Sequence, residues 1–88
     1  MINFAAIDAT FERVKTELIY ADEKWGTEFD DKNTLSDWVA YTINYIGQAT
    51  RMDATEEGKV VALRKAIGLL TNALVRIETQ TMAKRHFD

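Results

Sequence analysis

No proline interrupts this chain of 88 residues, and apolar side chains recur at intervals of three and four along most of its length. Proline ends or kinks helices because it lacks a backbone donor and clashes with the preceding turn, so its absence permits long helices. Intervals of three and four place side chains on one side of an α-helix. The sequence therefore predicts an all-α fold, organised as a single domain over residues 1–88.

Residues typical of helix ends divide the chain into three predicted helices. The first ends at Gly26, because glycine accepts the left-handed backbone that often follows a helix. A polar loop, "GTEFDDKN", comes next. Thr34, with Asp37 three residues later, predicts a capping arrangement at the start of the second helix, and Thr55 predicts the start of the third.

Each predicted helix has an apolar row that we expect to form the core. The rows are Ile7, Phe11, Val14, Leu18, Ala21 and Trp25 in the first helix, Leu35, Val39, Thr42, Ile46 and Ala49 in the second, and Val60, Leu63, Ile67, Leu70, Leu74 and Ile77 in the third.

Two segments of the second and third helices lack charge on every side. Residues 38–50 and residues 66–75 contain no Asp, Glu, Lys or Arg. A helix that is uncharged all round is generally buried all round, and three helices of one small chain cannot bury two such segments completely. We therefore expect a homo-oligomeric helical bundle in which these segments face a partner chain.

Composition argues against several functional classes. The chain has no cysteine and a single histidine, which removes disulfides and thiolate zinc sites and leaves little for general-base chemistry. A net charge of −3 argues against nucleic-acid binding, which usually needs a basic surplus. The N-terminal residues lack a signal-peptide pattern, and no apolar stretch reaches the roughly 20 residues of a membrane helix. We expect a soluble cytoplasmic protein that binds neither nucleic acid nor membrane.

The second predicted helix carries an unusual polar row. Its members are Asp37, Tyr41, Asn44, Gln48 and Arg51, and the three in the middle are neutral, whereas surface helices are usually rich in Lys and Glu. Neutral amides with a guanidinium at one end can recognise the edge of a base and a phosphate.

Aromatic side chains accompany this row. Trp38 and Tyr45 lie beside it on the same helix, and rings of this kind can stack on a base. Packing within the core or against another subunit is the alternative explanation, because aromatic residues at helical spacing are commonly core residues. The two explanations are compatible if a pocket lies at a subunit interface.

Two further sets of polar residues could bind a ligand, but we interpret both as parts of the protein surface without a ligand. The acidic residues of the loop over residues 26–33 lack the order of a calcium-binding loop, so we interpret them as solvated. Lys65, Asn72 and Arg76 share one side of the third helix. That side lies opposite the predicted apolar row, so we interpret it as a solvent-facing surface rather than an anion clamp.

At "ADEKWGTEFDDKNTLSDWVAYTINYIGQA" and "ALRKAIGLLTNALVRIE", the chain resembles the small MazG-like proteins, often phage-encoded, of the all-α nucleoside triphosphate pyrophosphohydrolase group. The similarity runs from about Glu17 to Glu78. The resemblance implies helices assembled into dimers or tetramers, with a nucleotide pocket between them. Its best marks are Asp22 to Gly26, the pair Asp37 and Trp38, Gly47, and the pair Leu63 and Arg64.

The chain departs from this family at the metal site. Active members carry a Glu-Glu-x-x-Glu motif and a Glu-x-x-Asp motif on successive helices, and these acids hold Mg²⁺ against the triphosphate. In this chain the first motif falls on Asn44, Tyr45 and Gln48, and the second falls near Ala66 and Leu69. Because every acid is replaced, we expect no catalytic residue, no metal and no cofactor.

The resemblance and the replaced acids together favour a catalytically degenerate phage protein that acts in the host cytoplasm. It would bind and sequester, without metal, a nucleotide or a nucleotide-derived host signal, cyclic signals included. One alternative is an active Mg²⁺-dependent pyrophosphohydrolase that uses Glu17, Asp22 or Asp37, and another is a structural or protein-inhibiting oligomer without a small ligand. The expected ligand-binding residues are Trp38, Tyr41, Asn44, Tyr45, Gln48, Arg51 and Arg64, with the two arginines as candidates for phosphate.

Overall fold

Helices account for nearly all regular structure in the described part of the chain. The computed structural model describes residues 1–26 and 28–85, without the side chains of Trp25 and Phe29. A single backbone bridge, between Thr34 and Ala83, is the exception among these residues. The all-α fold predicted from the sequence is confirmed. The helices are α1 (Phe4–Trp25), α2 (Glu28–Asp31), α3 (Leu35–Ala49) and α4 (Glu56–Glu78).

The predicted ends of the long helices are confirmed by their hydrogen bonds. Gly26 has a φ of 75°, and its N–H donates to the Asp22 carbonyl at 2.8 Å. The backbone N–H of Thr34 donates to the Asp37 carboxylate at 2.9 Å, and the Asp37 N–H donates back to the Thr34 hydroxyl at 3.3 Å. The Thr55 hydroxyl accepts from Gly58 at 3.0 Å. Local side-chain chemistry therefore sets where these helices start and stop.

One predicted loop contains a helical turn. The polar residues 26–33 predict a loop, but α2 forms there over Glu28–Asp31. Its acidic residues favour a helix N-terminus, where backbone N–H groups carry partial positive charge. Side chains of α4 also hold this turn in place, as described below, and such a contact cannot be inferred from local propensity.

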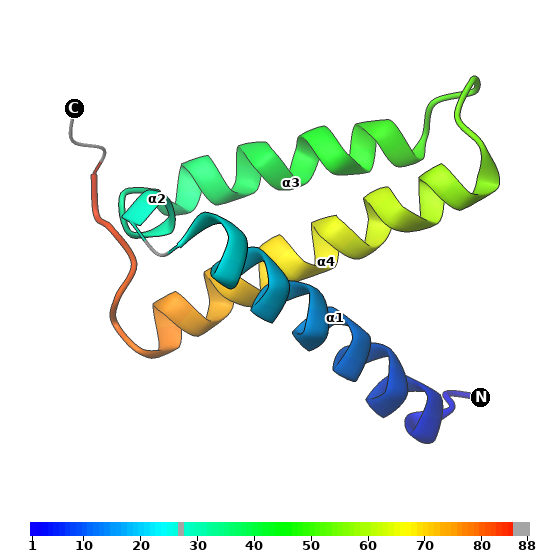
Figure 1. Cartoon of the computed structure of the whole chain (residues 1–88), viewed down its shortest axis with the longest axis horizontal. Coiled ribbons are helices and arrows are strands. Elements are labelled where there is room, and N and C mark those ends of the chain that lie inside the picture. Colours follow the sequence, from blue (N-terminus) through cyan, green and yellow to red (C-terminus); the bar gives the residue numbers. More distant parts are fainter. Residues whose placement is uncertain (27, 86–88) are drawn as a thin grey trace.

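The helices are arranged as a hairpin with one crossing helix. Figure 1 shows α3 and α4 side by side and antiparallel, joined by the turn over residues 50–55. The first helix crosses α4 near Gly68, where a Cβ atom would lie 3.7 Å from the Leu18 side chain. The N-terminal half of α1 extends beyond the crossing, and Phe4 and Phe11 are 73% and 54% exposed.

Small residues rather than the predicted aliphatic row face the interior of the hairpin on α4. The buried apolar residues of α4 are Ala62, Ala66 and Ala73, whereas Leu63 and Leu74 of the predicted row are 52% and 57% exposed. The predicted core row of α4 is therefore wrong. Small side chains let the backbones of α4 and its neighbours approach closely. Which side of α4 becomes buried depends on the helices that pack against it, and helical periodicity does not identify those helices.

Within the predicted core row of α3, one residue is fully buried. Thr42 is buried, but Leu35 and Val39 are 48% and 41% exposed. The large buried side chain of α3 is Trp38, which is 2% exposed. The buried residues of the hairpin thus combine a large indole on α3 with small alanines on α4, as close-packed cores commonly do. Val14 of α1, 1% exposed, is a core residue as predicted.

Candidate functional site

The middle of the predicted polar row faces outward from α3. Asn44, Gln48 and Arg51 are exposed, and Tyr41 is 36% exposed. The Tyr41 hydroxyl donates to the Asn33 side-chain oxygen at 3.4 Å. Because the amides of Asn44 and Gln48 stand one turn apart on one side of the helix, both can donate to and accept from a single planar ligand.

Asp37, the first member of the row, has a structural role. Its carboxylate completes the capping box at the N-terminus of α3. A carboxylate at this position also lies close to the positive end of the helix dipole. Asp37 is therefore part of the scaffold that starts α3.

The Arg51 guanidinium, at the far end of the row, already holds a carboxylate. Its Nε and Nη2 atoms donate to the two oxygens of Asp53 at 3.2 and 3.3 Å. Both side chains are well exposed, at 63% and 75%. Exposed ion pairs contribute little to stability, so this pair can open to admit a phosphate at small energetic cost.

The two aromatic residues predicted to accompany the row have different environments. Trp38 is buried, with the Arg76 guanidinium 5.7 Å from its ring centroid, so its ring faces are not open to a base in this chain. Tyr45 is half-buried, and the Lys65 ammonium lies 5.5 Å from its ring centroid. Tyr45 and Lys65 therefore place an aromatic ring and a cation together between α3 and α4.

Arg64 faces α1 rather than the polar row. Its guanidinium donates to the Glu17 carboxylate at 3.3 Å, and the two side chains are 35% and 41% exposed. The consecutive residues Arg64 and Lys65 thus point toward different helices, α1 and α3. The sequence does not indicate that Lys65 lies over Tyr45, because this contact depends on how α3 and α4 face each other.

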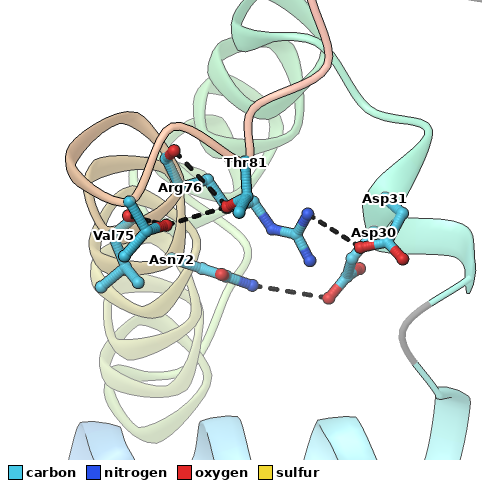
Figure 2. A network of polar contacts seen from close by, with 7 residues as sticks. Asp30, Asp31, Asn72, Val75, Arg76 and Thr81 are labelled. Carbon is cyan, nitrogen blue, oxygen red and sulfur yellow. Dashed lines mark hydrogen bonds and ion pairs between the residues drawn. The ribbon is translucent and has the colours of Figure 1, made fainter.

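A second polar cluster anchors α2 to the C-terminal half of α4 (Figure 2). The Asn72 amide donates to the Asp30 carboxylate at 3.4 Å, and Arg76 Nη1 donates to Asp31 at 3.0 Å. The Arg76 side chain is only 12% exposed. The interpretation of this side of α4 as a solvent-facing surface is therefore wrong for Asn72 and Arg76. We call these four residues the α2–α4 cluster.

Asp30 is the titratable group that this cluster perturbs. Burial raises the pKa of the Asp30 carboxyl above its usual 3.8, because a charged carboxylate loses solvation there. The carboxylates of Asp22 and Asp31 raise it further, while the Arg76 charge and the Asn72 hydrogen bond oppose the shift. The net result is a carboxyl that holds its proton more tightly in the folded chain.

The acids considered for an alternative metal site are dispersed. Glu17 binds Arg64, and Asp37 caps α3. Across residues 1–26 and 28–85, no three acidic or histidine side chains gather closely enough to hold a metal ion. No helix within the same ranges combines the length and the apolar character needed to cross a membrane.

Comparison with models of known protein families, with curated proteins and with solved structures finds no match for this chain. The resemblance to MazG-like proteins therefore stays a prediction.

Proposed function

We propose that this chain is a binding protein for a nucleotide or a nucleotide-derived signal, cyclic signals included, and that it sequesters this ligand without metal. In this proposal the chain is a phage-type MazG-like domain that has lost the acidic motifs and acts as a homo-oligomer in the host cytoplasm. The observation that carries the proposal is the outward row of neutral hydrogen-bonding groups on α3 beside the Tyr45–Lys65 pair.

Each part of a nucleotide has a suitable group on this surface. Asn44 and Gln48 supply donors and acceptors for the edge of a base. Tyr41 and Tyr45 supply rings, and stacking of a base on an aromatic side chain contributes on the order of 1–3 kcal/mol. Trp38 does not offer a stacking surface in the single chain, because its own ring is buried.

Phosphate can be held by cations without a bridging metal. Arg51 stands at the end of the row, and Lys65 lies over Tyr45. A guanidinium binds two phosphate oxygens through parallel hydrogen bonds. In an active enzyme of the resembled family, Mg²⁺ also screens the repulsion between acids and phosphate, and the neutral residues at these positions of α3 remove the need for that screening. Arg64, held by Glu17, is a weaker candidate.

Calorimetry in the presence of EDTA tests the proposal against nucleoside mono- and triphosphates, dinucleotides and cyclic nucleotides. We expect at least one of these ligands to bind with micromolar or tighter affinity. Arg51→Ala should weaken binding at least tenfold, while Asp53→Asn should strengthen it by releasing the guanidinium. Asn44→Ala should change which base is preferred.

Arg13→Ala is the matched control, because Arg13 is an exposed arginine on α1, away from the polar row. It removes the same charge and should leave the affinity unchanged. Absence of binding across the panel would contradict the proposal. Equal affinities for the parent chain, Arg51→Ala and Arg13→Ala would show that the polar row does not hold phosphate.

A further inference from the structure

A groove lies where the segment after α4 folds back onto the start of α3. Its volume is about 960 Å³, toward the upper end of the roughly 300–1,000 Å³ that small-molecule sites occupy. The first turn of α3 lines it with Leu35 and Ser36, and the end of α4 lines it with Arg76 and Ile77. Residues 82–85 complete its wall. We call this site the tail groove.

Main-chain contacts fix the shape of the tail groove. Gln80 has a φ of 58°, the left-handed conformation that commonly ends a helix and redirects the chain. The Thr81 N–H donates to the Arg76 carbonyl at 2.8 Å. Figure 1 shows the segment that follows, in red, running from the end of α4 toward the start of α3, where a backbone bridge joins Thr34 and Ala83. The walls are therefore held by the chain itself and do not depend on a ligand.

The charged residues of the tail groove are cations. Arg76, Lys84 and Arg85 line it, and no acidic residue does so in the part of the chain that the structure describes. The whole chain, in contrast, has a net charge of −3. Lys84 and Arg85 are exposed, so their side chains can turn toward a ligand. A local excess of positive charge in a cleft attracts anions.

Arg76 is the fixed member of this set. Its side chain is 12% exposed, its Nη1 donates to Asp31 at 3.0 Å, and its guanidinium lies 5.7 Å from the centroid of the Trp38 ring. A guanidinium has five N–H donors. The Nε atom of Arg76 is buried without an acceptor among the described residues, although buried donors normally have a partner. Arg76 is therefore an ordered guanidinium with donors left for another oxygen (Figure 2).

The tail groove also has apolar walls. Leu35 and Ile77 are 48% and 46% exposed, and both line the groove. The exposed Ser36 adds a hydroxyl that can donate to an oxygen of a ligand. An inorganic anion would occupy only part of this volume and would leave the apolar side chains in water. The lining therefore suits an anionic group joined to an apolar body.

We propose that the tail groove binds a small phosphorylated molecule. The three cations hold its phosphate, and Leu35 and Ile77 contact the rest of the molecule. A phosphate monoester carries between one and two negative charges at neutral pH and has three strong acceptor oxygens. Several cations match this group better than they match the single charge of a carboxylate, and a guanidinium binds two of its oxygens through parallel hydrogen bonds.

The surroundings of the tail groove favour a compact ligand over a nucleic acid. Asp31 is 63% exposed and lies against Arg76, and Glu28 and Asp30 belong to the same short helix. These acids would repel the successive phosphates of a polynucleotide, which needs an extended basic surface. A single phosphate can contact the cations alone.

The tail groove is separate from the polar row of α3. No residue of the polar row lines it. Asn44 follows Ser36 by eight residues, which corresponds to about 12 Å along the helix. The inference therefore does not rest on the proposed function.

Two-dimensional NMR of the ¹⁵N-labelled chain tests the proposal with phenyl phosphate, a probe that combines a phosphate with an apolar ring. We expect saturable binding at millimolar or lower concentrations, with the largest shifts at the backbone amides of Ser36, Ile77 and Lys84. Inorganic phosphate should shift the same amides but bind several-fold more weakly, because it lacks the apolar part. Benzyl alcohol, which lacks the charge, should cause no saturable shift.

The double variant Lys84→Gln/Arg85→Gln should weaken the binding of phenyl phosphate by roughly tenfold, because two charged donors are lost. Arg13→Gln/Lys15→Gln is the matched control, since it removes the same two charges from exposed positions of α1. The control should keep the parent affinity. All four positions are exposed, so circular dichroism should show intact helices in both variants.

Several outcomes would overturn the proposal. These are the absence of saturable shifts, equal affinities of the parent chain and both double variants, and shifts at Asn44 and Gln48 in place of the tail groove. A phosphoserine peptide that binds more tightly than phenyl phosphate would assign the groove to a protein partner and refute a small-molecule site. Absence of nucleotide binding in the calorimetry described above would refute the proposed function and leave these NMR measurements as the test of the tail groove.

Discussion

Several residues have a different role from the one that their residue type suggests, because burial and neighbouring side chains determine what each residue can do. Trp38 has a ring suited to stacking on a base, but it is 2% exposed and lies against Arg76. Arg76 has the charge of a surface residue, yet its side chain is 12% exposed and binds Asp31. Asp30 is drawn into the same cluster, where burial raises its pKa. This shift makes a prediction about stability.

Asp30→Asn should stabilise the folded chain at neutral pH. Folding raises the pKa of Asp30, so the folded chain binds the Asp30 proton more tightly than the unfolded chain does. This preference contributes fully to the free energy of unfolding below pH 3.8, and the contribution is lost as the pH rises through the folded-state pKa. Asparagine stays neutral and can still accept from Asn72. Thermal unfolding should therefore show a higher midpoint for the variant at pH 7 and little difference from the parent near pH 3. A lower midpoint at pH 7 would show that the ionised carboxylate is stabilising.

At the scale of elements, close approach of helices depends on small residues at their crossings. The α3–α4 hairpin closes over Ala62, Ala66 and Ala73, and α1 meets α4 at Gly68. A Cβ added to Gly68 would lie 3.7 Å from the Leu18 side chain, which is ordinary van der Waals contact. The crossing therefore has room for a methyl group and not for a larger side chain.

Gly68→Ala should raise the free energy of unfolding by about 0.5–1 kcal/mol, because alanine is the better helix former and its methyl group contacts Leu18. Gly68→Leu should lower it, because the longer side chain would push α1 away from α4. Urea unfolding measures both effects. Gly47 of α3 has no atom within 4 Å of its added Cβ, so Gly47→Leu is the control that should be tolerated. Equal losses of unfolding free energy in Gly68→Leu and Gly47→Leu would contradict the close approach of α1 and α4 at Gly68.

At the scale of the whole molecule, no three acidic side chains within residues 1–26 and 28–85 come close enough together to hold a metal ion. Glu17 binds α4, Asp30 and Asp31 attach α2, and Asp37 caps α3. Each of these carboxylates takes part in a contact that holds an element in position. Hydrolysis of a nucleoside triphosphate in the resembled family needs several acids around Mg²⁺.

The chain should therefore release no pyrophosphate above background from any NTP or dNTP supplied with Mg²⁺ or Mn²⁺. Neutral amides at Asn44 and Gln48 bind Mg²⁺ too weakly to replace carboxylates. A coupled pyrophosphate assay checks this result. Turnover that disappears in Asp37→Asn or Asp22→Asn, while circular dichroism shows an intact fold, would instead support an active pyrophosphohydrolase.

The sequence by itself determined the class of fold, the number of long helices and several of their ends. These features depend on local chemistry: the absence of proline, helical spacing of apolar residues, the Thr34–Asp37 capping box and the backbone freedom of Gly26. It also determined that Asn44 and Gln48 share one side of α3, because helical geometry alone places them there.

Only the tertiary structure decided which side of each helix is inside. Periodicity identifies a row but not its partner, so helical spacing predicts the aliphatic row of α4 as part of the core although most of it is exposed. The burial of Trp38, the contact of Lys65 with Tyr45 and the formation of α2 all depend on residues far away in the sequence. The helices could pack against one another in several ways, and the free energy of each arrangement depends on all of their surfaces together. Local sequence therefore does not identify the arrangement of lowest free energy.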